Sequence, residues 1–100
     1  IFRAMAEAIQ TSKLRARLTG DGLKPITMEE AFFMGTKGGG SFFGKVGSFE
    51  EGYEADAIVL DESRIPHPQK LTVKERLERF LYLRGDDWVF HKYVKGRRLF

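Results

Sequence analysis

The chain has 100 residues, of which 42% are hydrophobic and 31% charged, with a net charge of +3 and no cysteine. These values predict one small globular domain and exclude a disulfide framework and a thiolate metal site. A chain without cysteine fits a reducing compartment, and we expect a cytoplasmic location. No apolar run approaches the roughly 20 residues that span a bilayer, so we expect no membrane partner.

The first element is an amphipathic helix, predicted over residues 1–18. Apolar residues recur at a period near 3.6, which is typical of one helix face. The residues of this face are Ile1, Phe2, Met5, Ala8, Ile9, Leu14 and Leu18. The run Gly20-Asp21-Gly22 should end the helix. Because the helical pattern is already under way at Ile1 with no N-cap, we expect the chain to be a piece of a longer protein.

A second, short helix is predicted through Ala31 and Met34. Thr27 and Glu30 have the spacing of a capping box, in which each side chain binds the backbone N–H of the other residue. Gly35 lies within this helix or ends it.

The glycine-rich segment Gly38–Gly47 contains most of a phosphate-binding P-loop, in Gly39, Gly44 and Lys45. A P-loop needs a preceding strand, a following helix and a Ser or Thr after the lysine. Here a helix precedes, and Val46 and Gly47 follow. We therefore expect the glycines to allow close packing of a short helical turn, with Phe42 and Phe43 anchored in apolar surroundings.

The third region begins with the apolar run Ala57–Leu60, which predicts an interior strand buried on both faces and ended by Asp61. His67 lies between Pro66 and Pro68, which excludes a helix or a central strand there. Thr72 and Glu75 form a second capping box.

The helix after this capping box should bury Val73, Leu77, Phe80 and Leu81, pair Glu75 with Arg79 on its outer side, and end at Gly85. Alternating residues from Val89 to Val94 then predict a hairpin with Gly96 in its turn. The order of elements indicates an α+β arrangement without a βαβ rhythm.

None of the candidate site residues forms a catalytic pattern. The histidines, His67 and His91, have no second ligand at helical or strand spacing, so no zinc site is predicted. The carboxylate pairs Glu50-Glu51 and Asp86-Asp87 are interpreted as solvated turns, and Arg84-Gly85-Asp86 as a chance integrin-like tripeptide. Trp88, Phe90 and Tyr93 are interpreted as half-buried sheet residues in preference to a stacking platform for bases. Basic residues approach a single face only over Lys92–Arg98, so we expect no nucleic-acid partner.

The segment ITMEEAFFMGTKGGGSFFGKVGSFEEGYEADAIVLD resembles the part of the amidohydrolase superfamily that closes the barrel and enters a small β domain. The matching positions are Thr27, Glu30, Ala31, Thr36, Gly39, Gly44, Gly47, Phe49, Gly52, Ala55, Asp56 and Asp61. Two further stretches, AMAEAIQTSKL and ERLERFLYLRGDDWVFHKYVKGRRLF, are similar to the guanine deaminase family. The sequence departs from that family at Arg84 and at Trp88-Val89-Phe90.

The resemblance implies an α+β fragment of a larger enzyme. Residues 1–44 would be the last helices of a TIM (β/α)8 barrel, and residues 45–100 the C-terminal part of a small β-sandwich domain with one helix near 73–84. The parent would be a zinc- or iron-dependent hydrolase of purine catabolism that converts guanine and water to xanthine and ammonia.

The same resemblance places the metal-binding and catalytic residues outside this chain. We therefore name no catalytic, substrate-binding or metal-binding residue, and we expect the fragment to bind no metal and to be inactive alone. Its partner would be the rest of the parent chain, with a homodimer in the parent. Ile1, Met5, Phe32 and Phe33 would pack against the missing part of the barrel, so the isolated fragment should bind a hydrophobic dye or self-associate.

Two alternatives stay open. The parent could be another amidohydrolase that acts on a related heterocycle, because the substrate pocket lies outside this sequence. The chain could also be a stand-alone basic binding module that uses Lys92–Arg98, in which case its binding to a polyanion would depend steeply on salt.

Overall fold

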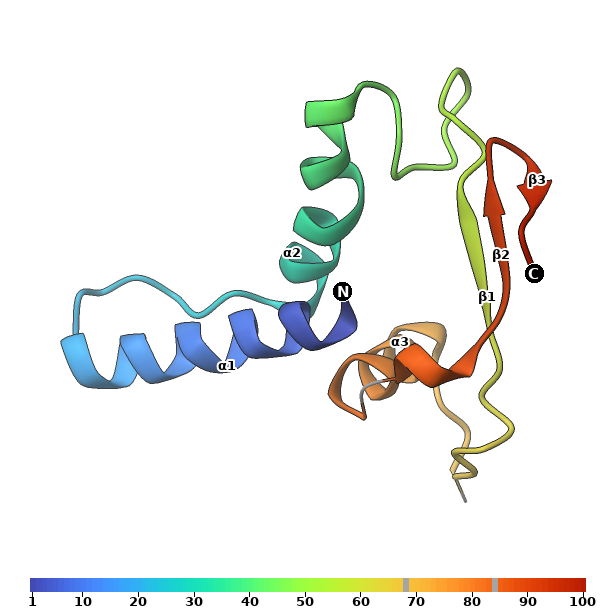
Figure 1. Ribbon diagram of the computed structural model, residues 1–100. Helices are drawn as coiled ribbons and strands as arrows, with labels where there is room; N and C mark the ends of the chain where they lie inside the picture. The colour runs from blue at the N-terminus through green and yellow to red at the C-terminus, as the bar shows by residue number, and fades with distance from the viewer. Residues whose placement is uncertain (68, 84) are drawn as a thin grey trace.

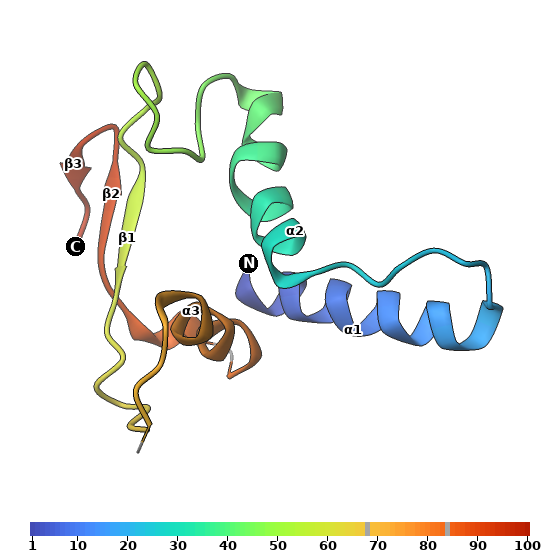
Figure 2. The same cartoon turned by 180° about the vertical axis from the view of Figure 1, so that it is seen from behind.

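The computed structural model describes residues 1–67, 69–83 and 85–100 and has the expected α+β character (Figure 1). Its helices are α1 (Phe2–Thr19), α2 (Met28–Phe33) and α3 (Val73–Tyr82). Its antiparallel sheet has the strand order β1 (Ala57–Leu60), β2 (Val89–Val94), β3 (Arg97–Arg98). The molecule is flat, with extents of 47 × 39 × 21 Å. Figure 2 shows α1 and the sheet at opposite sides, with α3 between them.

Helix α1 confirms the predicted span and its glycine stop. The Met5 amide donates to the Ile1 carbonyl at 3.0 Å, and the Gly20 amide donates to the Ala16 carbonyl at 3.3 Å. Gly20 has a φ of 58°, the left-handed conformation that ends many helices.

The buried face of α1 covers only its first two-thirds. It consists of Phe2, Met5, Ala6, Ile9 and Ser12. The predicted extension of this face to Leu14 and Leu18 is wrong, because these side chains are 59% and 75% exposed. The reason is visible in Figure 1: α2 and α3 meet α1 near its N-terminal end, and only an extended loop runs along the remainder.

Helix α2 begins at the predicted capping box. The Glu30 amide donates to the Thr27 hydroxyl at 3.2 Å, and the Thr27 amide donates to the Glu30 carboxylate at 2.8 Å. The helical path continues through a π-helical turn, Met34–Gly38, and later a 3-10 turn, Ser41–Phe43. Gly35 therefore lies inside the helical segment. A Cβ on Gly35 would lie 2.1 Å from Cε of Met5, so the absent side chain lets α1 approach.

The expected burial around the glycine segment is only partly correct. Phe42 and Phe43 are 87% and 79% exposed and contact each other edge to face, so the apolar anchoring predicted for them is wrong. Met5 is buried, and Phe32 packs beside the core, so both find partners within this chain. Ile1 and Phe33 remain exposed, as expected.

The core lies where the three helices meet. Its buried members are Phe2, Met5, Ile9, Met28, Ala31 and Leu81. Phe32, Leu60, Leu77 and Tyr82 border it. The sheet therefore contributes to this core chiefly through the end of β1.

Helix α3 starts at the second capping box and ends two residues before the predicted limit of 84. Glu75 donates its amide to the Thr72 hydroxyl at 3.2 Å and accepts the Thr72 amide at 2.7 Å. Phe80 and Leu81 are buried and Leu77 is half-buried, but Val73 is 77% exposed, so its predicted burial is wrong. Gly85 does not end the helix; it opens the 3-10 turn Gly85–Trp88.

The expected outer pair on α3 is replaced by other contacts. Glu75 is engaged in the capping box, and the Arg79 guanidinium donates instead to the carbonyls of Ile65 and Pro66, at 3.0 and 3.4 Å. This binding ties the preceding loop to the helix. Pro68 and Arg84 lie outside the described residues.

The sheet departs from the prediction of an interior strand. β1 lies at an edge of the sheet, and Ile58 and Val59 are 43% and 42% exposed. An edge position leaves one side of a strand without a neighbouring strand. The register of β1 shifts between Val59 and Leu60, and Leu60 borders the core.

The predicted hairpin is confirmed. β2 and β3 pair through Tyr93 with Arg98 and Val94 with Arg97. The turn places Lys95 at a φ of 50° and Gly96 at a φ of 75°, both positive as in a two-residue hairpin turn. No helix of the described ranges is long and apolar enough to cross a membrane.

Candidate functional site

The structure keeps the candidate metal ligands apart. His67 lies in the loop before α3, with Nδ1 against the Gln69 carbonyl. His91 lies on β2, with Nδ1 3.0 Å from the Phe100 carbonyl. Over residues 1–67, 69–83 and 85–100, no group of three or more His, Cys, Asp or Glu side chains could hold a metal ion.

The glycine segment has no P-loop geometry, because a helical turn precedes it and an irregular loop follows Lys45. Its glycines serve close packing, as predicted. A Cβ on Gly40 would lie 2.6 Å from the Val46 carbonyl oxygen, and one on Gly47 would lie 2.4 Å from the Thr36 carbonyl oxygen. These residues therefore bring two backbone segments together.

The Glu50-Glu51 pair is not an acid/base pair. Glu50 forms an ion pair with Lys37 at 2.5 Å and accepts the Ser48 hydroxyl at 2.7 Å. The hydrogen bond from Lys37, followed by that from Ser48, lowers the pKa of Glu50 below its usual value. A carboxylate held ionised in this way is poorly suited to act as a general acid.

Of the three aromatic residues expected to be half-buried in the sheet, Tyr93 is half-buried on β2. The expectation is wrong for Phe90, which is 60% exposed, and Trp88 is half-buried but lies in the 3-10 turn before the sheet. Trp88 packs edge to face on the buried Phe80, with ring centroids 5.6 Å apart. The His91 ring contacts the rings of both Phe90 and Tyr93, with centroid distances of 4.2 and 6.3 Å. The basic residues of this region all lie on the β2–β3 hairpin. Lys92 is on β2, Lys95 is in the turn, and Arg97 and Arg98 form β3.

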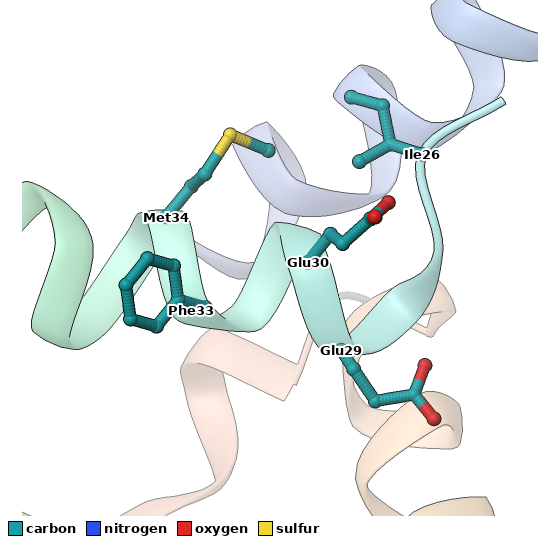
Figure 3. Close-up of a pocket in the computed structure, with 5 residues that line it drawn as sticks. All are labelled: Ile26, Glu29, Glu30, Phe33 and Met34. Carbon is teal, nitrogen blue, oxygen red and sulfur yellow. The ribbon is translucent and has the colours of Figure 1, made fainter. Parts of the chain in front are cut away.

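An open apolar depression on α2 is the candidate surface of this chain (Figure 3). Its lining residues are Ile26, Glu29, Glu30, Phe33 and Met34. Phe33 and Met34 are 53% and 48% exposed on adjoining turns of the helical segment. Figure 3 shows the Glu30 side chain extending toward Ile26 and the Glu29 side chain pointing away, on the side of α3.

Both carboxylates of this depression already have partners. Glu30 closes the capping box, and Glu29 forms an ion pair with Lys74 on α3. The hydrogen bond from Lys74 is the main cause that lowers the pKa of Glu29. The depression therefore offers apolar contact and no free acid or base, which suits docking of another apolar surface better than chemistry.

The ion pairs that join the elements were not predicted from the sequence. Lys37 pairs with Glu50, and Glu29 pairs with Lys74 on a different helix. The partners of each pair are far apart in the sequence. Charge patterns predict ion pairs only between residues three or four positions apart on a helix, so these pairs could not be predicted. The run Gly38-Gly39-Gly40 is the feature of the sequence that indicates a close approach of backbone segments in this region.

Comparison with known proteins identifies related chains. A family model described as the Amidohydrolase family matches residues 1–99. A guanine deaminase of Dictyostelium discoideum is 30% identical over 82 residues, which cover 75% of this chain and 18% of that protein. A crystal structure of guanine deaminase from C. acetobutylicum, with guanine bound in its active site, is 47% identical and superimposes with a TM-score of 0.91. The match covers 99% of this chain and 23% of that chain, so this chain spans less than a quarter of either relative.

Proposed function

Because this chain belongs to the amidohydrolase family, we propose that it is the C-terminal portion of a metal-dependent hydrolase that deaminates guanine. The reaction consumes guanine and water and releases xanthine and ammonia. The observation that carries this proposal is the 47% identity, over 99% of the chain, to a guanine deaminase with bound guanine. The match covers the helices, the glycine segment and the sheet together, so it is not confined to one motif.

The role of these 100 residues in the enzyme is structural. The described residues do not fit a metal site, because no group of suitable side chains comes together. The metal, zinc or iron, and the catalytic groups would therefore be held by the rest of the parent chain. Residues 1–44 would serve as the last barrel helices and residues 45–100 as part of the small β domain.

The exposed apolar side chains support such a docking role. Phe33, Met34 and Ile58 are each more than two-fifths exposed although each is large and apolar. Burial of such groups against a partner is favourable by about 25 cal/mol per Å². The partner would be the remainder of the parent chain. The parent would form a homodimer, lie in the cytoplasm and act in purine breakdown.

The test measures ammonia and xanthine formation by the full-length protein and by the isolated 100-residue chain. We expect the full-length protein to release both products from guanine in a chelator-sensitive way. We expect the isolated chain to release neither, even with added zinc.

Two results would contradict the proposal. Deamination by the isolated chain, abolished by a chelator, would show that it holds the catalytic groups. If the full-length protein does not act on guanine but hydrolyses a related heterocycle, the family assignment stands and the proposed substrate is wrong.

A further inference from the structure

The connection between the helices and the sheet, residues 44–56, contains no helix or strand and links the end of the helical segment to β1 (Figures 1 and 2). It leaves the 3-10 turn that ends at Phe43 and enters β1 at Ala57. Such a link normally lets the two parts move relative to each other. Here, two different kinds of contact restrain it.

The first restraint is steric. Gly47 has a φ of 82° and lies so close to the π-helical turn that a Cβ would be 2.4 Å from the Thr36 carbonyl oxygen and 2.9 Å from the Lys37 amide nitrogen. Both neighbours are backbone atoms, which cannot rotate away as a flexible side chain can. The contact therefore requires glycine for two reasons, its conformation and its lack of a side chain.

The second restraint is electrostatic and starts from the same turn. The Lys37 ammonium pairs with Glu50 at 2.5 Å and lies 5.6 Å from the centroid of the Tyr53 ring. The Lys37 and Glu50 side chains are 40% and 56% exposed, so water and salt weaken their attraction. This contact is therefore much easier to open than the glycine contact.

The restrained segment continues directly into the hairpin contacts. The Glu54 amide donates to the Lys45 carbonyl at 2.8 Å, which closes the loop on itself. Beyond it, the Gly96 amide donates to the Ala55 carbonyl at 2.9 Å, and the Lys95 amide donates to the Asp56 carboxylate at 2.8 Å. A shift of the loop would thus move the tip of the β2–β3 hairpin.

We propose that residues 36–53 form a conformational clasp that restrains the loop, and through it the tip of the β2–β3 hairpin, relative to the helical segment. The backbone contact between Gly47 and the Thr36 carbonyl holds the loop in place, and we call it the fixed point. The Lys37–Glu50 ion pair can open in water and salt, and we call it the releasable point. This clasp does not depend on the proposed enzymatic function, because it follows from contacts within the described chain. It also gives the glycine-rich segment a role other than phosphate binding.

The test is amide hydrogen exchange, followed by mass spectrometry, of peptides that cover residues 44–56 in the full-length protein. Gly47→Ala is compared with Gly52→Ala, in the same loop. Gly52 has a similar φ of 86°, but its Cβ would meet only the flexible end of Lys45, at 3.7 Å. In both variants an alanine must adopt a positive φ, at a similar energetic cost. The difference in exchange between the two variants therefore reports the steric contact at Gly47. We expect exchange in Gly47→Ala to exceed that in Gly52→Ala on the order of tenfold.

The releasable point is tested with Lys37→Met, with Lys13→Met on the exposed side of α1 as the control. We expect exchange over 44–56 to rise about two- to fivefold in Lys37→Met only. High salt should raise exchange in the wild type and leave Lys37→Met unchanged. If Gly47→Ala does not fold, the Lys37→Met comparison decides the proposal, and wild-type exchange with wild-type salt dependence in that variant would overturn the clasp.

Equal exchange in the two glycine variants would overturn the fixed point. Wild-type exchange and wild-type salt dependence in Lys37→Met would overturn the releasable point.

Discussion

Leu81 is the residue at which the three helices converge. It comes from α3, is 0% exposed, and shares a cluster with Phe2, Ile9 and Met28. Val73 belongs to the same helix but is 77% exposed. A comparison of substitutions at Leu81 and Val73 therefore distinguishes the effect of burial from the effect of being in this helix.

Leu81→Ala should lower the free energy of unfolding by about 2–5 kcal/mol, because it removes buried methyl groups and leaves a cavity between the helices. Val73→Ala is the matched control and should change stability by less than about 0.5 kcal/mol. Urea unfolding followed by circular dichroism measures both. A loss in Leu81→Ala no larger than that in Val73→Ala would contradict the assignment of Leu81 to the core.

At the scale of elements, the capping boxes fix where α2 and α3 begin. In both, a threonine hydroxyl accepts an amide three residues later, and a glutamate accepts the threonine amide. These bonds satisfy donors that would otherwise lack partners at a helix start. They are local in sequence, which is why the sequence predicts them correctly.

Thr72→Ala should destabilise the protein by about 0.5–2 kcal/mol through loss of the α3 cap. Thr72→Ser keeps the hydroxyl and should restore most of this loss. Thermal unfolding of the three proteins under one buffer condition provides the comparison. Equal stability of the alanine and serine variants would mean that the hydroxyl has no capping role.

At the scale of the whole molecule, a flat arrangement leaves much apolar surface open. The exposed large side chains extend over helices, loop and sheet, and include Phe33, Phe49, Ile58 and Phe90. Exposure of this extent on a small chain is typical of a surface that contacts another apolar surface. The structure thus explains which faces of the chain are available to the rest of the enzyme we propose.

We expect the isolated 100-residue chain to bind a hydrophobic dye such as ANS or to self-associate. The combined change Phe33→Ser with Met34→Ser should reduce dye fluorescence, because it removes the apolar lining of the depression on α2. Leu18→Ser, at the far end of α1, is the control and should have a smaller effect. ANS fluorescence and sedimentation velocity are the measurements. A monomer that does not bind ANS would contradict the prediction.

Several features of this protein can be read from the residues alone. These are the helix starts at Thr27 and Thr72, the stop at Gly20, the hairpin turn at Gly96, and the resemblance to amidohydrolases. The helix starts, the stop and the turn each depend on residues a few positions apart, so propensity and hydrogen bonding within one segment are sufficient. The absence of P-loop geometry followed from the same local reasoning.

Which apolar residues are buried depends on how the helices and strands pack against one another. The residue types of Leu14, Leu18, Val73 and Phe42 suit a core, but no helix or strand among the described residues covers these side chains. β1 likewise has the composition of an interior strand and yet lies at an edge. The partners of Lys37 and Glu29 are distant in sequence and come together only when the helices and the glycine segment pack. Burial and long-range pairing depend on this packing, which no local pattern of residues specifies.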